Sequence, residues 1–289
     1  MKTKGMTHTI NCQGRLFSFD RPVVMGILNV TPDSFYDGGS YYNNAEAIRK
    51  RATQIVSEGA DIIDIGAYST RPGAKNVAES DELRRLSMAL DIVRKDHPDA
   101  IISVDTFRGE VARRSIKELG ANIINDISAY EMDPDMLEAV AEVKAPYVLT
   151  HMQGTPATMQ EAPHYDGRVT DAVVTMLSKK VNELTSRGVS DIIIDPGFGF
   201  GKTVEQNFQM MADLHMFKAF DRPLLVGVSR KSMIFKTIGG TAKTSLNGTS
   251  ILNTVALLRG ADILRVHDVK ECVEVVKLVA AIEDGGREQ

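Results

Sequence analysis

Cysteine is scarce in this sequence, because Cys12 and Cys272 are the only two among 289 residues and stand near opposite ends. They form no CxxC pair, so neither is predicted to belong to a metal site or a redox motif. We expect two inert, reduced thiols. A disulfide between them is the less favoured alternative, because cytosolic proteins keep their thiols reduced.

Long apolar runs and an excess of basic residues are also missing. No stretch of about 18 apolar residues is present, so no segment is predicted to span a bilayer. The first residues, MKTKGMTHTINCQGRLF, lack the apolar core of a signal peptide. The formal net charge of −4 creates no field that would attract a nucleic-acid backbone. We therefore expect a cytoplasmic protein with no nucleic-acid or membrane partner, in which a local cluster of cations binds any anionic ligand.

Short apolar runs rich in β-forming residues recur along the chain and are the candidate strands: 23–30, 62–67, 101–106, 123–127, 147–152, 192–195, 224–229 and 263–267. Segments with helical periodicity lie between them, such as 45–58, 81–95, 134–143 and 169–187. This βαβα alternation is typical of a parallel sheet. Eight repeats of strands that are apolar on both faces favour a closed barrel over a doubly wound open sheet.

The predicted fold is therefore of the α/β class, a single (β/α)8 TIM barrel domain over residues 1–289. Residues 9–19 precede the first barrel strand, and Gln13 and Gly14 form a plausible turn in the middle of this segment. We expect an N-terminal β-hairpin that plugs the barrel floor.

Polar residues follow nearly every candidate strand: Asn29, Thr70, Arg71, Asp105, Asn125, Asp126, His151, Asp195, Ser229, Lys231, Arg265 and His267. Solvated strand ends account for any one of them. The whole series has a better explanation, because the carboxyl ends of barrel strands form the active-site face. We expect these side chains to converge there.

Two of the loops suit a metal ion and a phosphate. In GILNVTPDSFYDGG, Asn29 ends a strand before a loop rich in oxygen ligands, which suits Mg²⁺ beside a diphosphate, although a helix-capping turn is an alternative. In AYSTRPGA, Thr70 and Arg71 precede Pro72, whose ring favours an extended conformation at Arg71. Arg71 there suits a phosphate clamp or a surface salt bridge.

Two carboxylates and a glycine-rich segment suggest a pocket for a flat ligand. Asp105 and Asp195 each close an apolar run and, as partly desolvated groups, need partners, although Asp105 also suits a helix cap. The segment DPGFGFGKT leaves three residues between Gly197 and Gly201 instead of the four that a Walker phosphate loop requires, which disfavours a nucleotide triphosphatase. Its glycines permit close approach of a ligand, and Phe200 supplies an apolar wall or a core side chain.

The last two segments are cationic. In LLVGVSRKSMIF, the residues Ser229, Arg230, Lys231 and Ser232 lie at a strand-to-helix junction, which favours a bound carboxylate or phosphate. In ILRVHD, Arg265 and His267 alternate with period two and face the same side.

The chain resembles the dihydropteroate synthases at GILNVTPDSF, STRP, SVDT, DPGFGFGK, SRKS and RVHD, which together extend over nearly the whole sequence. The resemblance implies condensation of 6-hydroxymethyl-7,8-dihydropterin diphosphate with 4-aminobenzoate in folate biosynthesis, with Mg²⁺ as cofactor and pyrophosphate as leaving group. It also implies a homodimer.

The resemblance assigns roles to matching residues. The pterin would be bound by Asp105, Asn125, Asp195, Lys231 and Arg265. The diphosphate would be bound by Asn29, Arg71, Arg265 and His267, with Asn29 on the metal. The 4-aminobenzoate would be bound by Thr70, Pro72, Phe200, Lys231 and Ser232, under loops that carry Phe35 and Pro72. The catalytic set implied is Asn29, Arg71, Asp105, Asp195, Lys231, Arg265 and His267, and His151 receives no role.

An SN1-like displacement suits these groups, because cations stabilise the leaving pyrophosphate and a neutral aryl amine needs no strong base. A related pterin-binding methyltransferase module is the first alternative, and SRKS and RVHD disfavour it because a methyl-folate carries no diphosphate. A non-catalytic pterin or phosphate binder is the second, and in it the loop residues would be idle.

Overall fold

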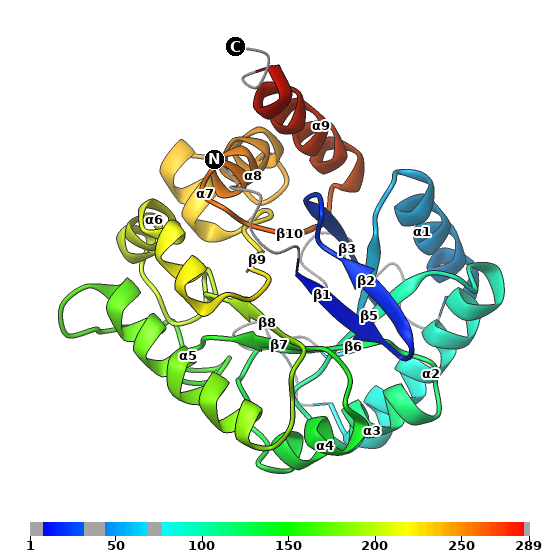
Figure 1. Ribbon diagram of the computed structural model, residues 1–289. Coiled ribbons are helices and arrows are strands. Elements are labelled where there is room, and N and C mark those ends of the chain that lie inside the picture. Colours follow the sequence, from blue (N-terminus) through cyan, green and yellow to red (C-terminus); the bar gives the residue numbers. More distant parts are fainter. Residues whose placement is uncertain (1–7, 32–43, 69–76, 286–289) are drawn as a thin grey trace.

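The computed structural model describes residues 8–31, 44–68 and 77–285, and they form a β-barrel surrounded by helices (Figure 1). The strands of the barrel are Val23–Asn29 (β3), Ile62–Gly66 (β4), Ile101–Asp105 (β5), Ile123–Asp126 (β6), Tyr147–Thr150 (β7), Ile192–Asp195 (β8), Leu225–Val226 (β9) and Ile263–Val266 (β10). They pair in parallel in the order β8-β7-β6-β5-β4-β3-β10-β9. A parallel bridge between Ile194 and Leu224 joins β8 to the start of β9, which closes the barrel.

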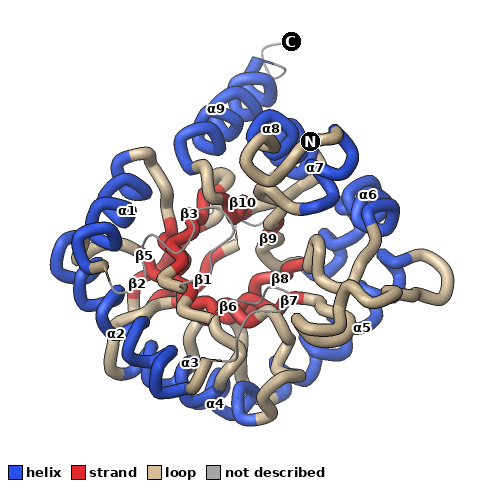
Figure 2. Tube along the Cα trace, turned by 180° about the vertical axis from the view of Figure 1, so that it is seen from behind, coloured by secondary structure: helices blue, strands red, loops and turns tan. Residues whose placement is uncertain are grey.

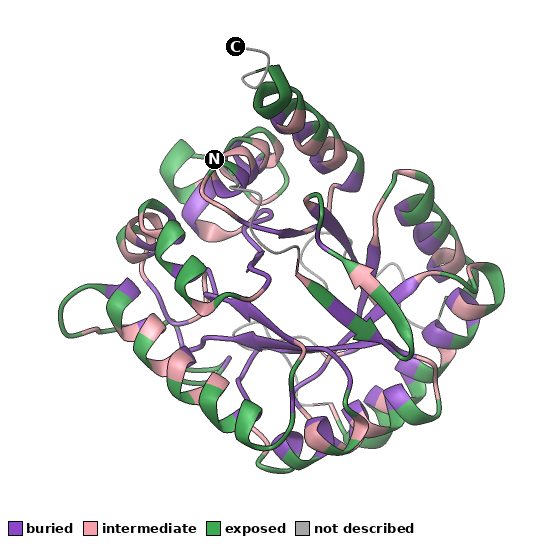
Figure 3. Ribbon diagram, in the orientation of Figure 1, coloured by how far each residue is buried: buried purple, intermediate pink, exposed green. Residues whose placement is uncertain are grey.

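Helices follow the strands and cover the outside of the barrel. They are Ala45–Ser57 (α1), Glu79–Asp96 (α2), Gly109–Lys117 (α3), Asp135–Val143 (α4), Val169–Ser186 (α5), Val204–Ala212 (α6), Ser232–Ile238 (α7), Leu246–Leu258 (α8) and Val269–Gly285 (α9), and a 3-10 helix spans Leu214–Phe220. Their inner faces are buried while their outer faces are exposed (Figure 3). The predicted α/β barrel is confirmed, and the four named helices begin and end within two residues of the structure.

Alternate residues of each strand pack in two separate cores, because successive side chains of a strand point to opposite faces. One core lies between strands and helices and includes Val24, Ile63 and Leu264. The other fills the barrel at the amino-terminal ends of the strands and includes Val23, Ile62 and Ile263. The strands are thus apolar on both faces near their beginnings, as the sequence predicts.

The hairpin of Thr9–Cys12 (β1) and Arg15–Ser18 (β2) lies across the amino-terminal end of the barrel, in front in Figure 1. Ile10, Cys12 and Phe19 pack into the inner core, where all three are buried. A hydrogen bond also joins the hairpin turn to the barrel, because the side-chain amide of Gln13 donates to the backbone carbonyl of Ala121 at 2.7 Å. The predicted plug of the barrel floor is therefore present.

Strand β9 is shorter than its predicted range of 224–229, because the chain leaves the sheet after Val226. The backbone N–H of Lys231 donates to the carbonyl of Val228 at 3.1 Å in a turn, and Arg230 has a φ of +57°. This early exit is not visible in the apolar run, and it brings Ser229 and Lys231 to the barrel mouth, the end viewed in Figure 2.

Candidate active site

The carboxyl ends of the strands place polar side chains inside the barrel, above the apolar core. On β4 the inward positions are Ile62, then Asp64, then Gly66. The inward face of this strand is therefore apolar at its amino-terminal end and polar nearer its carboxyl end. Strand pairing sets Asp64 beside Ser103 and Asp105 beside Asn125. The inward faces of neighbouring strands thus bring these groups close together at the carboxyl half of the barrel.

Arg265 lies between two carboxylates in this mouth. Its Nε donates to Asp64 Oδ2 and its Nη2 to Asp105 Oδ2, each at 2.7 Å. Asn125 completes the cluster, since its Nδ2 lies 3.2 Å from Asp64 Oδ2. Burial raises the pKa of Asp105, while the charge of Arg265 lowers it. The guanidinium is held by two carboxylates, so its plane is fixed relative to the strands β4 and β5 that carry them.

Asp64 belongs to this cluster, although the sequence interpretation did not select it. Its side chain is fully buried and accepts hydrogen bonds from both Arg265 and Asn125. A signal was available, because a lone carboxylate inside the apolar run IIDIGA stands at an inward position of its strand. A buried charge of this kind requires a partner.

Asp195 ends β8 and accepts a hydrogen bond from the backbone N–H of Gly197 at 2.8 Å. Burial raises the pKa of this carboxyl, and the neighbouring Lys231 lowers it. Gly197 has a φ of +71°, and an added Cβ would lie 1.8 Å from the carbonyl oxygen of His151. Glycine is therefore required at the position where this chain turns away from the carboxylate.

Lys231 contacts the turn that follows Asp195. Its Nζ donates to the carbonyl of Phe198 at 2.5 Å and lies 4.5 Å from the centre of the Phe200 ring. Burial lowers the pKa of Lys231 to about 8, while Asp195 raises it. The ammonium and the aromatic ring thus form one wall of the mouth, and Ser232 follows as the first residue of α7.

His267 lies at the end of β10 beside Ser229, whose hydroxyl oxygen is 3.1 Å from its Nδ1. Burial lowers the pKa of His267 to about 3, and the charge of Arg265 lowers it further. The ring is therefore neutral at pH 7 and acts as a hydrogen-bonding group. Arg230 points the other way and forms two 2.8 Å hydrogen bonds with Asp268.

Asn29 ends β3, the strand that pairs with β10. An added Cβ at Gly66 would lie 3.2 Å from Asn29 Oδ1 and 3.5 Å from Asp105 Cβ, so the bare glycine lets these two side chains lie together. No group of three acidic, histidine or cysteine side chains in the described part of the chain could enclose a metal ion. One amide oxygen suits Mg²⁺, which keeps water and takes phosphate oxygens as further ligands.

Comparison with known proteins agrees with this geometry. The model of the family described as pterin binding enzyme matches residues 25–267. A curated dihydropteroate synthase from Escherichia coli is 44% identical over 271 residues, which are 93% of this chain and 94% of that protein. The chain belongs to the dihydropteroate synthase family of pterin-binding enzymes.

Solved structures of dihydropteroate synthases have the same fold. One from Yersinia pestis, in a complex with a sulfonamide drug, has a TM-score of 0.90 at 38% identity and covers 96% of this chain and 100% of its own. One from Xanthomonas albilineans with 4-aminobenzoic acid has a TM-score of 0.87 at 38% identity, covering 96% and 99%. Dihydropteroate synthases are transferases, and the similarity to them extends over nearly the full length of this chain.

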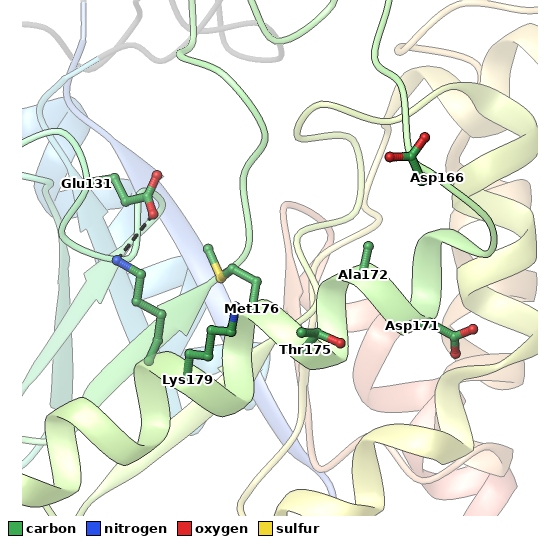
Figure 4. Close-up of a pocket in the computed structure, with 8 residues that line it drawn as sticks. Glu131, Asp166, Asp171, Ala172, Thr175, Met176 and Lys179 are labelled. Carbon is green, nitrogen blue, oxygen red and sulfur yellow. Dashed lines mark ion pairs between the residues drawn. The ribbon is translucent and has the colours of Figure 1, made fainter.

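Some residues expected from the dihydropteroate synthase resemblance lie outside the described residues: Phe35, Thr70, Arg71 and Pro72. The described ones that the structure brings to the barrel mouth are Asn29, Asp105, Asn125, Asp195, Phe200, Lys231, Ser232, Arg265 and His267. A hollow of about 570 Å³ on α5, where Lys180 pairs with Glu131, includes none of the predicted site residues (Figure 4).

Proposed function

We propose that this protein is a dihydropteroate synthase that joins 6-hydroxymethyl-7,8-dihydropterin diphosphate to 4-aminobenzoate, within one pterin-binding domain over residues 1–289. The observation that carries the proposal is the inner end of the barrel mouth, where Asp105, Asn125 and Asp195 lie beside the half-buried cations Lys231 and Arg265. Carboxylates accept the adjacent N–H groups of a pterin ring, and the amide both donates and accepts. Arg265 stacks on the face of the ring as a planar cation.

The diphosphate lies toward Asn29, Arg71, Arg265 and His267 in this proposal. His267, neutral because burial and Arg265 lower its pKa to about 3, donates a hydrogen bond to a phosphate oxygen. Asn29 would hold Mg²⁺ through its amide oxygen, and the metal when bound would supply positive charge beside the leaving group. Arg265 lies between the pterin and diphosphate subsites, so it serves both.

The 4-aminobenzoate subsite is formed by Thr70, Pro72, Phe200, Lys231 and Ser232. Phe200 and Lys231 support this assignment, because the ring and the ammonium lie 4.5 Å apart and form an apolar wall with a charged edge. The carboxylate of the substrate is placed at Ser232, at the start of α7, where backbone N–H groups are not used within the helix.

The proposed reaction is an SN1-like displacement. The bond between the methylene carbon and the diphosphate oxygen breaks, and its electron pair leaves with pyrophosphate. The catalytic set is Asn29, Arg71, Asp105, Asp195, Lys231, Arg265 and His267. The cations among them stabilise the departing anion, and the carboxylates favour the positive charge that spreads over the pterin. The amine of 4-aminobenzoate then forms the C–N bond and loses its proton to water.

The test is release of pyrophosphate from the two substrates together. We expect release that requires 4-aminobenzoate and stops when a chelator removes divalent metal, with recovery on addition of Mg²⁺, because the leaving group is densely charged. Full activity in excess chelator would contradict the metal role. If no pyrophosphate is released from the two substrates with Mg²⁺ present, the proposed synthase activity is wrong, even if the protein binds a pterin.

A homodimer is part of the proposal. The outer faces of the neighbouring helices α8 and α9 expose the apolar side chains of Ile251, Leu258, Leu278 and Ile282. Exposed apolar patches of this kind mark association surfaces. We expect sedimentation of the wild type at twice the chain mass and of Leu278→Asp at the chain mass. Leu16, on the hairpin, is about as exposed as Leu278, so Leu16→Asp is the control and should sediment as the wild type does.

A cytoplasmic location is also proposed, and the two cysteines support it because both are buried and unpaired. In the described ranges, no helix is both long and apolar enough to span a membrane.

A further inference from the structure

Lys202 is a buried lysine with three hydrogen-bond acceptors around its ammonium group. Its Nζ lies 2.9 Å from His151 Nδ1, 2.8 Å from the carbonyl oxygen of Gly197 and 3.0 Å from that of Phe200. The residue is 2% exposed and His151 is 5% exposed. A lysine ammonium has three N–H donors, so each one has a partner within the protein. Lys202 therefore has no donor left for an anionic substrate.

Burial lowers the pKa of Lys202 to about 7, while the charge of Asp195 raises it, so below pH 7 Lys202 is an ammonium and its contact with Nδ1 sets the tautomer of His151. An ammonium that donates to Nδ1 requires an unprotonated Nδ1, so the ring is neutral and carries its proton on Nε2. Burial lowers the pKa of His151 to about 2, and the charge of Lys202 lowers it further, which agrees with a neutral ring. The Tyr165 ring lies 6.0 Å away, and its hydroxyl donates to the carbonyl of Gly201 at 2.8 Å.

The two carbonyls that Lys202 binds lie at the two ends of the turn 197–200. Between them, the carbonyl of Phe198 accepts the hydrogen bond from Lys231. The turn is thus held from one side by Lys202 and from the other by Lys231. Its last residue, Phe200, carries the ring against which Lys231 lies. Any movement of this turn displaces the proposed wall for 4-aminobenzoate. Of the proposed pterin residues, Asp105 and Asn125 lie on strands away from the turn, and Asp195, on β8, accepts one hydrogen bond from it, from the Gly197 N–H.

We propose that Lys202 and His151 form a positioning pair that fixes the turn 197–200 and thereby sets the affinity for 4-aminobenzoate. This inference rests on the proposed function, because it takes Phe200 and Lys231 as the wall of that subsite. Neither residue of the pair touches substrate. His151 directly follows β7, and its backbone N–H donates to the carbonyl of Asp195 at the end of β8 at 3.0 Å. Its ring therefore anchors Lys202, and with it the turn, to the ends of two barrel strands.

The test compares variants of the full-length enzyme. Lys202→Met removes all three donors, His151→Leu removes one acceptor, and His151→Asn retains a polar atom near the position of Nδ1. We expect the first two to raise KM for 4-aminobenzoate about 10-fold or more, as loss of a hydrogen bond to a charged group does. KM for the pterin diphosphate should change much less, and His151→Asn should recover part of the effect.

The matched control is Tyr147→Phe, at the start of β7, which removes the 2.6 Å hydrogen bond from the Tyr147 hydroxyl to buried Asp126 at the end of β6. It lowers stability without contact to the turn, so both KM values should stay at the wild-type level. An equal rise of both KM values in Lys202→Met, or a rise in Tyr147→Phe as large as in His151→Leu, would overturn the positioning role.

A second measurement keeps the inference testable if Lys202→Met fails to fold. In ¹⁵N spectra of the wild type at pH 6, where Lys202 is an ammonium, His151 should show a protonated Nε2 and an unprotonated Nδ1, and a protonated Nδ1 would overturn the pair. Failure of the proposed function and failure of the positioning pair are distinguishable. A wild type that releases no pyrophosphate contradicts the proposed function, whereas the tautomer of His151 is measured without substrate and tests the pair alone.

Discussion

At the scale of the residue, Asp195 combines a hydrogen bond within the protein with its proposed role in binding the pterin. One oxygen accepts from the backbone N–H of Gly197 at 2.8 Å, and the proposed pterin N–H groups occupy the remaining lone pairs. An asparagine at this position keeps the shape but has only one acceptor oxygen. The Gly197 N–H competes for that oxygen, which leaves the new NH₂ group facing the donors of the pterin.

For Asp195→Asn we therefore expect pterin affinity to fall by roughly 1 to 3 kcal/mol, or about 5- to 150-fold, because a donor faces a donor in a buried pocket. Calorimetric titration of the folded variant with pterin measures this change. Asp191→Asn is the control, since Asp191 lies at the other end of the same strand and accepts from Asn11 of the hairpin. An unchanged dissociation constant for Asp195→Asn would show that Asp195 only caps the turn.

Asp195 and Asp64 show what the sequence could predict at this scale. Asp195 ends an apolar run, so its place on the active-site face followed from the barrel alone. Asp64 lies inside such a run, and its role follows from Arg265, a residue 201 positions later in the chain. The convergence of strand ends was therefore predictable, whereas the specific ion pairs within the mouth depend on side-chain packing that no local pattern specifies.

At the scale of the element, the hairpin was predictable because its turn and its alternation are local. Gln13 and Gly14 both have positive φ values, as a tight turn between antiparallel strands requires. The end of β9 was not predictable, because the apolar run continues to Val228 while the backbone turns away. Burial of these residues continues beyond the sheet, so the apolar pattern does not mark where β9 ends.

The hairpin should stabilise the barrel through one face only. Ile10→Ala should lower the free energy of unfolding by about 2 to 4 kcal/mol, because it leaves a cavity in the inner core where Ile10 is 1% exposed. Leu16→Ala on the same hairpin is the control and should change it by less than about 0.5 kcal/mol, because Leu16 is 71% exposed. Urea denaturation measures both, and equal losses would contradict the plug.

At the scale of the whole molecule, buried histidines should make stability depend on pH. Burial lowers the pKa of His151 to about 2, whereas histidine in an unfolded chain titrates near 6.5. Between these values the unfolded chain binds a proton that the folded chain does not. Stability due to this group is therefore complete above pH 6.5 and falls as pH falls, by up to about 1.4 kcal/mol per pH unit.

The buried carboxyls Asp195 and Glu82 have raised pKa values, for which burial is the largest cause, and they act in the opposite direction. The contribution of His151 is therefore measured by difference, from urea denaturation of the wild type and His151→Asn between pH 7 and pH 4. The wild type should lose stability more steeply than the variant as the pH is lowered. Parallel curves would mean that His151 is protonated in the folded enzyme.

The hairpin also closes one end of the barrel, because Ile10, Cys12 and Phe19 fill it, so within residues 8–31, 44–68 and 77–285 the barrel is entered at the carboxyl ends of its strands. Two substrates must then enter and two products must leave by the same route. In the proposed arrangement the pterin lies at the floor and 4-aminobenzoate lies nearer the entrance, against Phe200. From this difference in depth we expect the pterin diphosphate to bind first and 4-aminobenzoate that arrives early to obstruct it. An excess of the second substrate should consequently slow turnover.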